Sequence, residues 1–225
     1  MRQALLMMLT AATAYGKSTM QLDEVLEPIY PLHYGEPLES PAPIAEEHEQ
    51  TEFTLRLKTD VKGAGDSDIL INVSSTLAPL GVAHLQELVA DKFYNGAAFF
   101  RVAPDFVIQF GIAGTPEMNE KWTEPIRDDP VASSNTAGTL VYATAGADTR
   151  TTQMFINLID NTFLDAQGFA PFGKVVQGMD VINAIYNPTP DDGMGVDQGM
   201  YKANGNDWIR SEYPEINFIK KMTFE

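Results

Sequence analysis

The centre of the sequence reads Phe99-Phe100-Arg101-Val102-Ala103-Pro104-Asp105-Phe106-Val107-Ile108-Gln109-Phe110-Gly111. Aromatic and β-branched residues fill both halves of this stretch, and Pro104-Asp105 separates them. That composition is typical of two short strands joined by a turn. The stretch therefore predicts strands over 99–102 and 107–110, which carry the polar side chains of Arg101 and Gln109.

Segments of similar character lie on both sides of this stretch. Towards the N-terminus, Phe53, Leu55 and Leu57 alternate with polar residues, which indicates a half-buried strand, and a second strand is expected over Ile69–Val73. Towards the C-terminus, three more strands are predicted, over Thr139–Ala143, Met154–Asn157 and Phe172–Val176. The sequence thus indicates a mainly β fold.

Two segments are predicted to be helical. Pro79–Ala90 has apolar residues at three- and four-residue intervals, and Pro79 stands near its start, where a missing N–H is harmless. A second helix is predicted over Met179–Tyr186, just after Gly178. Many short strands with two separated helices favour a β-barrel whose ends are covered by helices.

The charge balance of the chain is strongly acidic. Its 225 residues include 15 Lys and Arg against 31 Asp and Glu, for a formal net charge of −16. Such a field repels phosphate backbones, so we expect no nucleic-acid partner. We interpret the acidity as favouring solubility, with attraction for basic partners as the alternative. The sequence contains no cysteine, which excludes disulfides, a thiolate nucleophile and cysteine-based zinc sites.

The first fifty residues differ in composition from the rest. Residues 1–18 carry Arg2 before a short apolar run and resemble a signal peptide, with an ordinary helix or a frayed tail as the alternative. The run is too short for a permanent membrane span. Residues 19–50 are rich in Pro and Glu and predict an extended arm, so the folded domain is expected over residues 51–225. We expect secretion or the secretory pathway, with an organelle lumen or the cytoplasm as alternatives.

Motifs built on a nucleophile or a metal are missing from the sequence. It has no P-loop, no HExxH and no GxSxG. His84 has no partner at metal-ligand spacing and is interpreted as structural. The acidic segment Asp191–Asp197 lacks the ligand spacing of an EF-hand and is interpreted as a solvated loop. We expect neither a metal nor another cofactor.

Several blocks of the chain, in their order and spacing, resemble the cyclophilin family of peptidyl-prolyl cis/trans isomerases. They are Phe93–Gly111, Gly138–Gly146, Thr151–Ile156, Phe163–Asp165 and Phe169–Val175. The resemblance covers residues 51–225 and is closest to the bacterial-like branch, which has Phe at the position of Phe163. It implies an eight-stranded antiparallel barrel capped by two α-helices, a substrate groove on its outer face, and a monomer.

The resemblance also implies roles for particular residues. Arg101 stands at the catalytic arginine position, and Gln109 and Phe106 are counted with it in the catalytic set. The substrate-binding positions are matched by Phe155, Leu164, Phe169, Met154, Gln153, Ala143, Thr144 and Phe163. Because Phe163 stands where many relatives have the Trp that favours cyclosporin, we expect weakened cyclosporin binding. The alternatives are a structural salt bridge for Arg101 and core packing for the aromatic side chains.

The chemistry of such a site requires no nucleophile. Resonance gives the peptide bond a rotational barrier of about 18–20 kcal/mol, and X–Pro bonds interconvert slowly. A fixed guanidinium can stabilise the twisted amide as its nitrogen gains electron density. We therefore expect an isomerase that acts on proline-containing peptides and folding proteins. The alternatives are a proline-peptide binding module or folding chaperone with incidental turnover, and an isomerase inhibited by its own arm.

Overall fold

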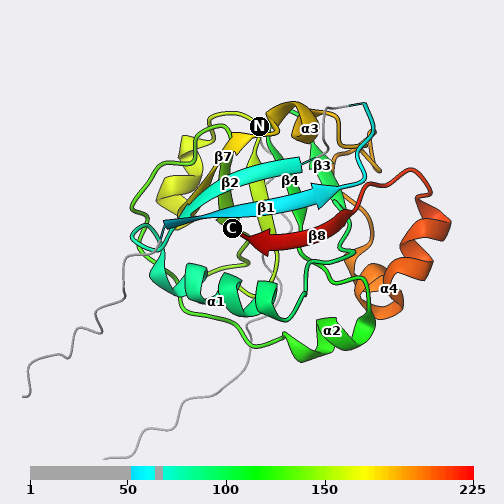
Figure 1. The fold of residues 1–225 in the computed structure, drawn as a ribbon, viewed down its shortest axis with the longest axis horizontal. Helices are drawn as coiled ribbons and strands as arrows, with labels where there is room; N and C mark the ends of the chain where they lie inside the picture. Colours follow the sequence, from blue (N-terminus) through cyan, green and yellow to red (C-terminus); the bar gives the residue numbers. More distant parts are fainter. Residues whose placement is uncertain (1–51, 64–67) are drawn as a thin grey trace, which may run out of the picture. The chain divides into compact units, whose positions relative to one another are not determined.

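The fold is a curled antiparallel sheet, seen in a computed structural model that describes residues 52–63 and 68–225. The strands follow the order β3-β4-β6-β5-β7-β2-β1-β8 (Figure 1). Their bounds are β1 Glu52–Thr59, β2 Asp68–Ser74, β3 Arg101–Ala103, β4 Val107–Phe110, β5 Thr139–Tyr142, β6 Met154–Asn157, β7 Pro171–Gln177 and β8 Ile219–Phe224. The predicted signal peptide (1–18) and arm (19–50) lie outside the described residues.

Hydrogen bonds between the segments that precede β3 and β8 bring the two edges of the sheet together. Ala98 and Phe218 form an antiparallel bridge. On either side of it, Phe99 N donates to Asn217 O (3.0 Å) and Ile219 N donates to Ala97 O (2.9 Å). All pairings between neighbouring strands are antiparallel. The eight-stranded antiparallel architecture expected from the sequence is therefore confirmed.

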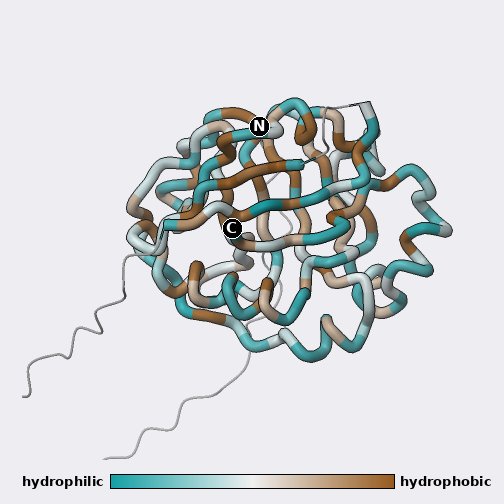
Figure 2. Tube along the Cα trace, in the orientation of Figure 1, coloured by the Kyte–Doolittle hydropathy of each residue, from teal (hydrophilic) through white to brown (hydrophobic). Residues whose placement is uncertain are grey.

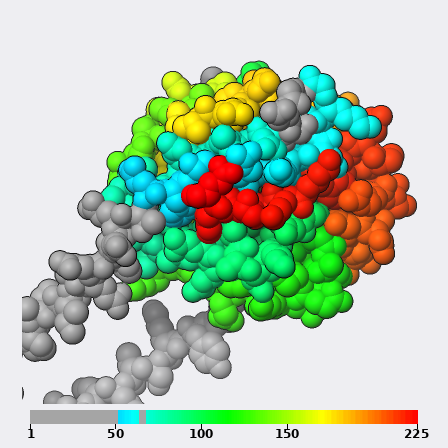
Figure 3. Space-filling model, viewed as in Figure 1, coloured from blue at the N-terminus to red at the C-terminus, as the bar shows by residue number. Residues whose placement is uncertain are grey.

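Side-chain alternation along the strands fills the interior of the barrel. In β1, Leu55 and Leu57 are fully buried and lie opposite Ile71 and Ile69 of β2. In Figure 2 the strands carry many of the hydrophobic segments, whereas the connections between them are largely hydrophilic. Figure 3 shows β8 lying against β1 on one face, above the surface of α1. Burial of alternate apolar residues provides the main stabilisation of this core.

Helix α1 spans Pro79–Ala90, as the sequence predicts. Its start is closed by the Asp129 carboxylate, which accepts hydrogen bonds from the backbone N–H groups of Leu80 (3.0 Å) and Gly81 (2.8 Å). Helix α3 spans Met179–Asn183 and is shorter than the predicted segment 179–186. Both predicted helices are thus present, and α1 buries its apolar face against the barrel.

Three further helical elements were not expected from the sequence. They are α2 (Pro116–Lys121), the 3₁₀ helix η1 (Thr162–Gln167) and α4 (Gln198–Glu212), so the described residues hold four α-helices rather than two. Helix α4 is kinked at Gly205, whose φ is 62°. It lies at one edge of the molecule and packs Tyr201 and Ile209 into a second apolar cluster with Phe100 (Figure 1). None of the helices in the described ranges is long and apolar enough to span a bilayer.

Candidate active site

Arg101 is the first residue of β3 and pairs with Gln109 of β4 across the sheet. Its Nη1 donates a hydrogen bond to Gln109 Oε1 (3.2 Å), and its Nε donates to the Gly193 carbonyl (3.0 Å). Among the described residues it forms no ion pair with a carboxylate. Burial lowers the pKa of Arg101, but guanidinium remains charged near neutral pH. Within residues 52–63 and 68–225, Arg101 is therefore a cation without a carboxylate partner, and part of its guanidinium makes no hydrogen bond there.

The loop before α4, which contains Gly193 and Gly195, packs against Arg101. Gly195 has a φ of 83°, and a Cβ placed on it would lie 2.7 Å from Arg101 Cβ and 2.9 Å from the Phe100 carbonyl. Val196 N also donates to that carbonyl (3.0 Å). Only a residue without a side chain can approach so closely. The segment interpreted as a solvated loop exposes Asp191 and Asp192, as expected, but its glycines also position the arginine.

An apolar cluster lies next to Arg101 on the outer face of the sheet. Its buried members are Val107, Val141, Phe155 and Leu164, and Phe106, Ala143 and Phe169 pack against them while remaining partly exposed. The Phe155 and Phe169 rings meet edge to face at 5.7 Å. The Phe106 ring centroid lies 5.8 Å from Arg101 Cζ. The structure thus places a cation beside an apolar surface of suitable chemistry for a proline ring.

Met154 does not belong to this face. Its side chain is fully buried inside the barrel, in the cluster that contains Phe110 and Ile156, whereas the next residue, Phe155, points outward. Successive side chains in a strand point to opposite faces, so Met154 and Phe155 cannot both line the groove. We therefore remove Met154 from the predicted substrate-binding set. The same alternation from Gln109 identifies Val107, which the sequence analysis missed.

Three glutamine side chains extend the polar part of the site. Gln109 Nε2 donates to Gln153 Oε1 (2.7 Å), and Gln153 Nε2 donates to Gln198 Oε1 (2.9 Å). Gln198, the first residue of α4, was not among the predicted site residues. Its helix is separated from the central stretch by more than eighty residues, and nothing in its local sequence suggested a contact with Gln153.

Ala143 and Thr144 follow β5 at the edge of the cluster. The Ala143 N–H donates to the Gln153 carbonyl (2.9 Å), which fixes the backbone beside the groove. The Thr144 hydroxyl lies 2.8 Å from the Thr149 hydroxyl, inside its own loop. That loop ends at buried Arg150, which pairs with Asp129 (3.0 Å). A contact between Thr144 and substrate remains a prediction.

Phe163 forms an exposed rim of the cluster. Its side chain is 57% exposed, and its ring stacks on Phe106 with the centroids 6.1 Å apart. It stands in η1 next to buried Leu164, so the same short element contributes one floor residue and one rim residue. The position at which many relatives have Trp therefore lies on the exposed rim of the cluster and not among its buried residues.

A buried polar network supports the cluster from below. Asn135 Nδ2 donates to the Phe169 carbonyl (2.9 Å) and to Asp165 Oδ1 (2.7 Å), while Asn161 Nδ2 donates to the Phe106 carbonyl (3.0 Å). Asn157 joins the two asparagines, at 3.1 and 2.7 Å. Burial would raise the pKa of Asp165, but the hydrogen bonds it accepts from Ser134 and Asn135 outweigh this effect and lower the pKa. The network fixes the backbones that carry the aromatic residues.

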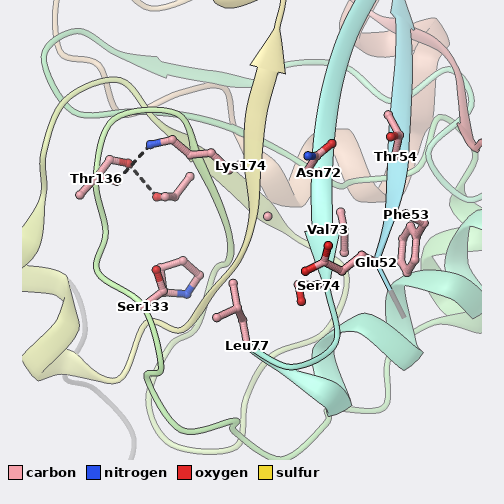
Figure 4. A pocket seen from close by; sticks show the side chains of 13 residues that line it. Glu52, Phe53, Thr54, Asn72, Val73, Ser74, Leu77, Ser133, Thr136 and Lys174 are labelled. Carbon is pink, nitrogen blue, oxygen red and sulfur yellow. Dashed lines mark hydrogen bonds between the residues drawn. The ribbon is translucent and has the colours of Figure 1, made fainter. Parts of the chain in front are cut away.

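A separate hollow of about 500 Å³ lies over β1, β2 and β7 (Figure 4). Val73, Leu77 and Lys174 are among its lining residues, and none of the predicted site residues is. The Lys174 amine already donates to Thr136 Oγ1 (3.1 Å). The hollow has no buried cation and no aromatic cluster, so we assign the chemistry to the Arg101 face.

The contacts of His84 are those of a residue that packs in the structure rather than in a site. It packs against Trp122 and Tyr142, and its Nε2 lies 2.9 Å from the Thr151 carbonyl, which makes Nε2 the protonated ring nitrogen. Within the part of the chain that the structure describes, no group of three or more His, Cys, Asp and Glu residues could hold a metal ion. Burial lowers the pKa of His84, against the opposing effect of its hydrogen bond.

Comparison with known proteins identifies the family. Residues 54–206 match the cyclophilin type peptidyl-prolyl cis-trans isomerases. The chain is 39% identical over 155 residues to the peptidyl-prolyl cis-trans isomerase of Acinetobacter baylyi, covering 65% of this chain and 79% of that protein. It is 38% identical over 128 residues to peptidyl-prolyl cis-trans isomerase B of Escherichia coli, covering 52% of this chain and 77% of that protein.

Solved structures agree with this assignment at the level of the fold. A crystal structure of a cyclophilin type peptidyl-prolyl cis-trans isomerase from Cryptosporidium parvum matches with a TM-score of 0.58 at 19% identity, over 78% of this chain and 98% of that one. The same protein in the presence of the dipeptide Ala-Pro matches with a TM-score of 0.56 at 18% identity, over 76% and 98%. This chain belongs to the cyclophilin family of peptidyl-prolyl cis-trans isomerases.

Proposed function

We propose that the protein performs the isomerase activity of its family through Arg101 and the adjoining apolar cluster. The observation that carries this proposal is the set of contacts that the Arg101 guanidinium makes. Its guanidinium is held by Gln109 and the Gly193 carbonyl, has no carboxylate partner among the described residues, and lies next to Phe106. A charge held in this way is available to a substrate.

The mechanism follows from the electronic structure of the peptide bond. When the C–N bond twists, the resonance is lost and the lone pair localises on the proline nitrogen. A hydrogen bond from Arg101 to that nitrogen is stronger in the twisted state than in either planar isomer. Interactions that strengthen only in the transition state lower the barrier. Arg101 is therefore the catalytic residue, and no proton transfer or covalent intermediate is required.

The other residues of the site take supporting roles. The cluster of Phe155, Leu164 and Phe169 with Phe106 receives the proline ring, and its burial holds the ring while the rest of the peptide rotates. Gln109 fixes the orientation of the guanidinium by accepting a hydrogen bond from one of its N–H groups. Ala143, whose N–H donates to the Gln153 carbonyl, and the adjacent Thr144 are proposed to line the edge of the groove.

The substrates we propose are proline-containing peptides within folding proteins. A relative solved in the presence of Ala-Pro supports a proline dipeptide as the central unit. Because Phe163 offers a smaller rim than Trp and is already stacked on Phe106, we also propose that cyclosporin binds weakly. We further propose a monomer that works in the secretory pathway or outside the cell, on the basis of the family and of the N-terminal apolar run.

The test of this function is the cis-to-trans exchange rate of an Ala-Pro-Phe peptide, measured with and without the protein. We expect acceleration by the wild type and a KM raised about tenfold or more in Phe155→Ala, because the ring loses its floor. A wild-type protein that leaves the uncatalysed rate unchanged but binds the peptide would instead favour a proline-peptide binding module.

A further inference from the structure

Gln198 occupies the far end of the polar row that begins at Arg101. The row runs from the guanidinium through Gln109 and Gln153 to Gln198, with donor–acceptor distances of 3.2, 2.7 and 2.9 Å. Gln198 is the first residue of α4, which lies at the edge of the barrel (Figure 1). All four side chains are partly exposed, so the row lies on the surface rather than inside the core.

The direction of every hydrogen bond in this row is fixed by its first member. A guanidinium can only donate, so Gln109 must turn its oxygen towards Arg101. Its nitrogen then donates to Gln153, whose nitrogen donates in turn to Gln198 Oε1. The Gln198 amide is left with its Nε2 group, which enters no hydrogen bond described within residues 52–63 and 68–225. The row therefore ends on an oriented, unused N–H donor.

The Gln198 donor lies close to the apolar cluster proposed to receive the proline, because its partner Gln153 is two residues from Phe155. Gln153 and Phe155 lie two residues apart around Met154, which points into the barrel, so both project from the outer face. Two residues of a strand span about 7 Å, which is also the span of two residues of an extended peptide. A peptide whose proline contacts Phe155 and which runs along the row brings a flanking residue to Gln153 and Gln198.

We propose that Gln198 is a further substrate-contacting residue, whose Nε2 donates a hydrogen bond to a backbone carbonyl of a residue flanking the proline. This inference rests on the proposed function, because it takes the Arg101 face as the substrate groove. A backbone carbonyl is present in every peptide, so the contact gives affinity for longer chains without selecting a side chain. It makes the enzyme favour polypeptide segments over isolated proline dipeptides.

The test compares two peptides and three variants. Exchange spectroscopy gives the Kd and the isomerisation rate at saturation for a blocked Ala-Pro dipeptide and for Ala-Ala-Pro-Phe. The variants are Gln198→Ala, which removes the donor, Gln198→Glu, which still accepts from Gln153 but presents oxygen in its place, and Asn204→Ala as the control. Asn204 is an exposed residue of the same helix, and its amide donates to the Met200 carbonyl within α4, its one oxygen acceptor among the described residues.

We expect both Gln198 variants to raise the Kd of the tetrapeptide by about five- to tenfold, the loss of one hydrogen bond, with Gln198→Glu the weaker binder. The saturated rate, the dipeptide Kd and the Asn204→Ala control should stay unchanged. An unchanged tetrapeptide Kd would overturn the inference, and so would a fall in the saturated rate alone, which would make Gln198 a positioning residue for Arg101. In both cases an active wild type leaves the proposed function standing, whereas an inactive wild type contradicts that function itself.

Discussion

Arg101 Nη1 lies 3.2 Å from Gln109 Oε1, and the two residues are direct partners in the β3–β4 pair. The strand register, rather than a flexible side-chain contact, therefore sets the distance between the cation and the amide that orients it. A second fixed acceptor, the Gly193 carbonyl, holds Nε at 3.0 Å. With two acceptors on different elements, the guanidinium plane is held before substrate arrives, which is the condition for electrostatic catalysis.

Replacing Gln109 with Ala should lower kcat without unfolding the protein. Arg101 then loses one of its two acceptors and samples several orientations, so we expect kcat to fall by about tenfold, the worth of one hydrogen bond to a charged group. Gln109→Glu is the contrasting variant, because its carboxylate would pair with Arg101 and draw the charge away from substrate. Kinetics with a saturating proline peptide measure both, and an unchanged kcat in Gln109→Ala would contradict the orienting role.

Replacing Gly195 with Ala should impair catalysis as well as stability. The new Cβ would press on Arg101 Cβ at 2.7 Å and displace the side chain that performs the chemistry. The matched control is Gly63→Ala, because Gly63 has a similar positive φ (84°) but no atom of the described residues within 4 Å of an added Cβ. Gly63→Ala should lose about 1 kcal/mol of stability from backbone strain, and Gly195→Ala should lose more, because its Cβ also meets the Phe100 carbonyl. Only Gly195→Ala should lose kcat, and equal kinetics in the two would show that the loop does not position Arg101.

Replacing Asn135 with Ala should weaken substrate binding through the backbone of the pocket. The change leaves buried partners without hydrogen bonds and should cost about 2 kcal/mol in the free energy of unfolding. Because Asn135 also holds the Phe169 carbonyl, we expect KM to rise several-fold. Asn119→Ala is the control, since that amide likewise bonds several backbone groups, around Ala113, but none in the pocket. If KM rises equally in both, the network has no specific link to the pocket.

The His84 side chain should make the protein less stable as the pH falls from 7.5 to 5.5. Burial lowers the pKa of His84 in the folded state below its ordinary value of 6.5. Below that value the unfolded chain binds a proton that folded His84 resists, so the free energy of unfolding decreases. His84→Gln keeps an N–H donor for the Thr151 carbonyl and should flatten this dependence. Urea denaturation at each pH checks it, and parallel curves would contradict the assignment.

The strands around the site could be predicted because they are short runs of aromatic and β-branched residues bounded by turn residues. In β1 the alternation of buried Leu55 and Leu57 with more exposed residues shows the period of two directly. Strand β8 was not predicted because Lys220 and Lys221 are adjacent in it. Only Ile219 and Met222 are buried, so its residues do not alternate between apolar and polar. Helix α4 was not predicted because Gly199 and Gly205 interrupt its helical pattern, and the helix is kinked at Gly205. Where the local pattern is broken, only tertiary contacts decide the structure.

The site shows the same division between local pattern and tertiary contact. Arg101, Gln109 and Phe155 lie on one face of neighbouring strands, so a motif that names one of them locates the others. Met154 was misplaced because its alternation with Phe155 was not applied. Gln198 and the asparagines 135, 157 and 161 resemble ordinary turn and surface residues in sequence, and only the fold brings them to the groove.

The central claim is that the charge and shape of Arg101 stabilise the twisted amide. The most direct measurement is kcat for cis-to-trans isomerisation of the Ala-Pro-Phe peptide by wild type, Arg101→Lys and Arg101→Ala. We predict that Arg101→Ala loses about a hundredfold or more in kcat at nearly unchanged KM. Arg101→Lys should recover only part of this loss, since an ammonium lacks the planar fork held by Gln109 and Gly193. Full activity in Arg101→Ala would contradict the account.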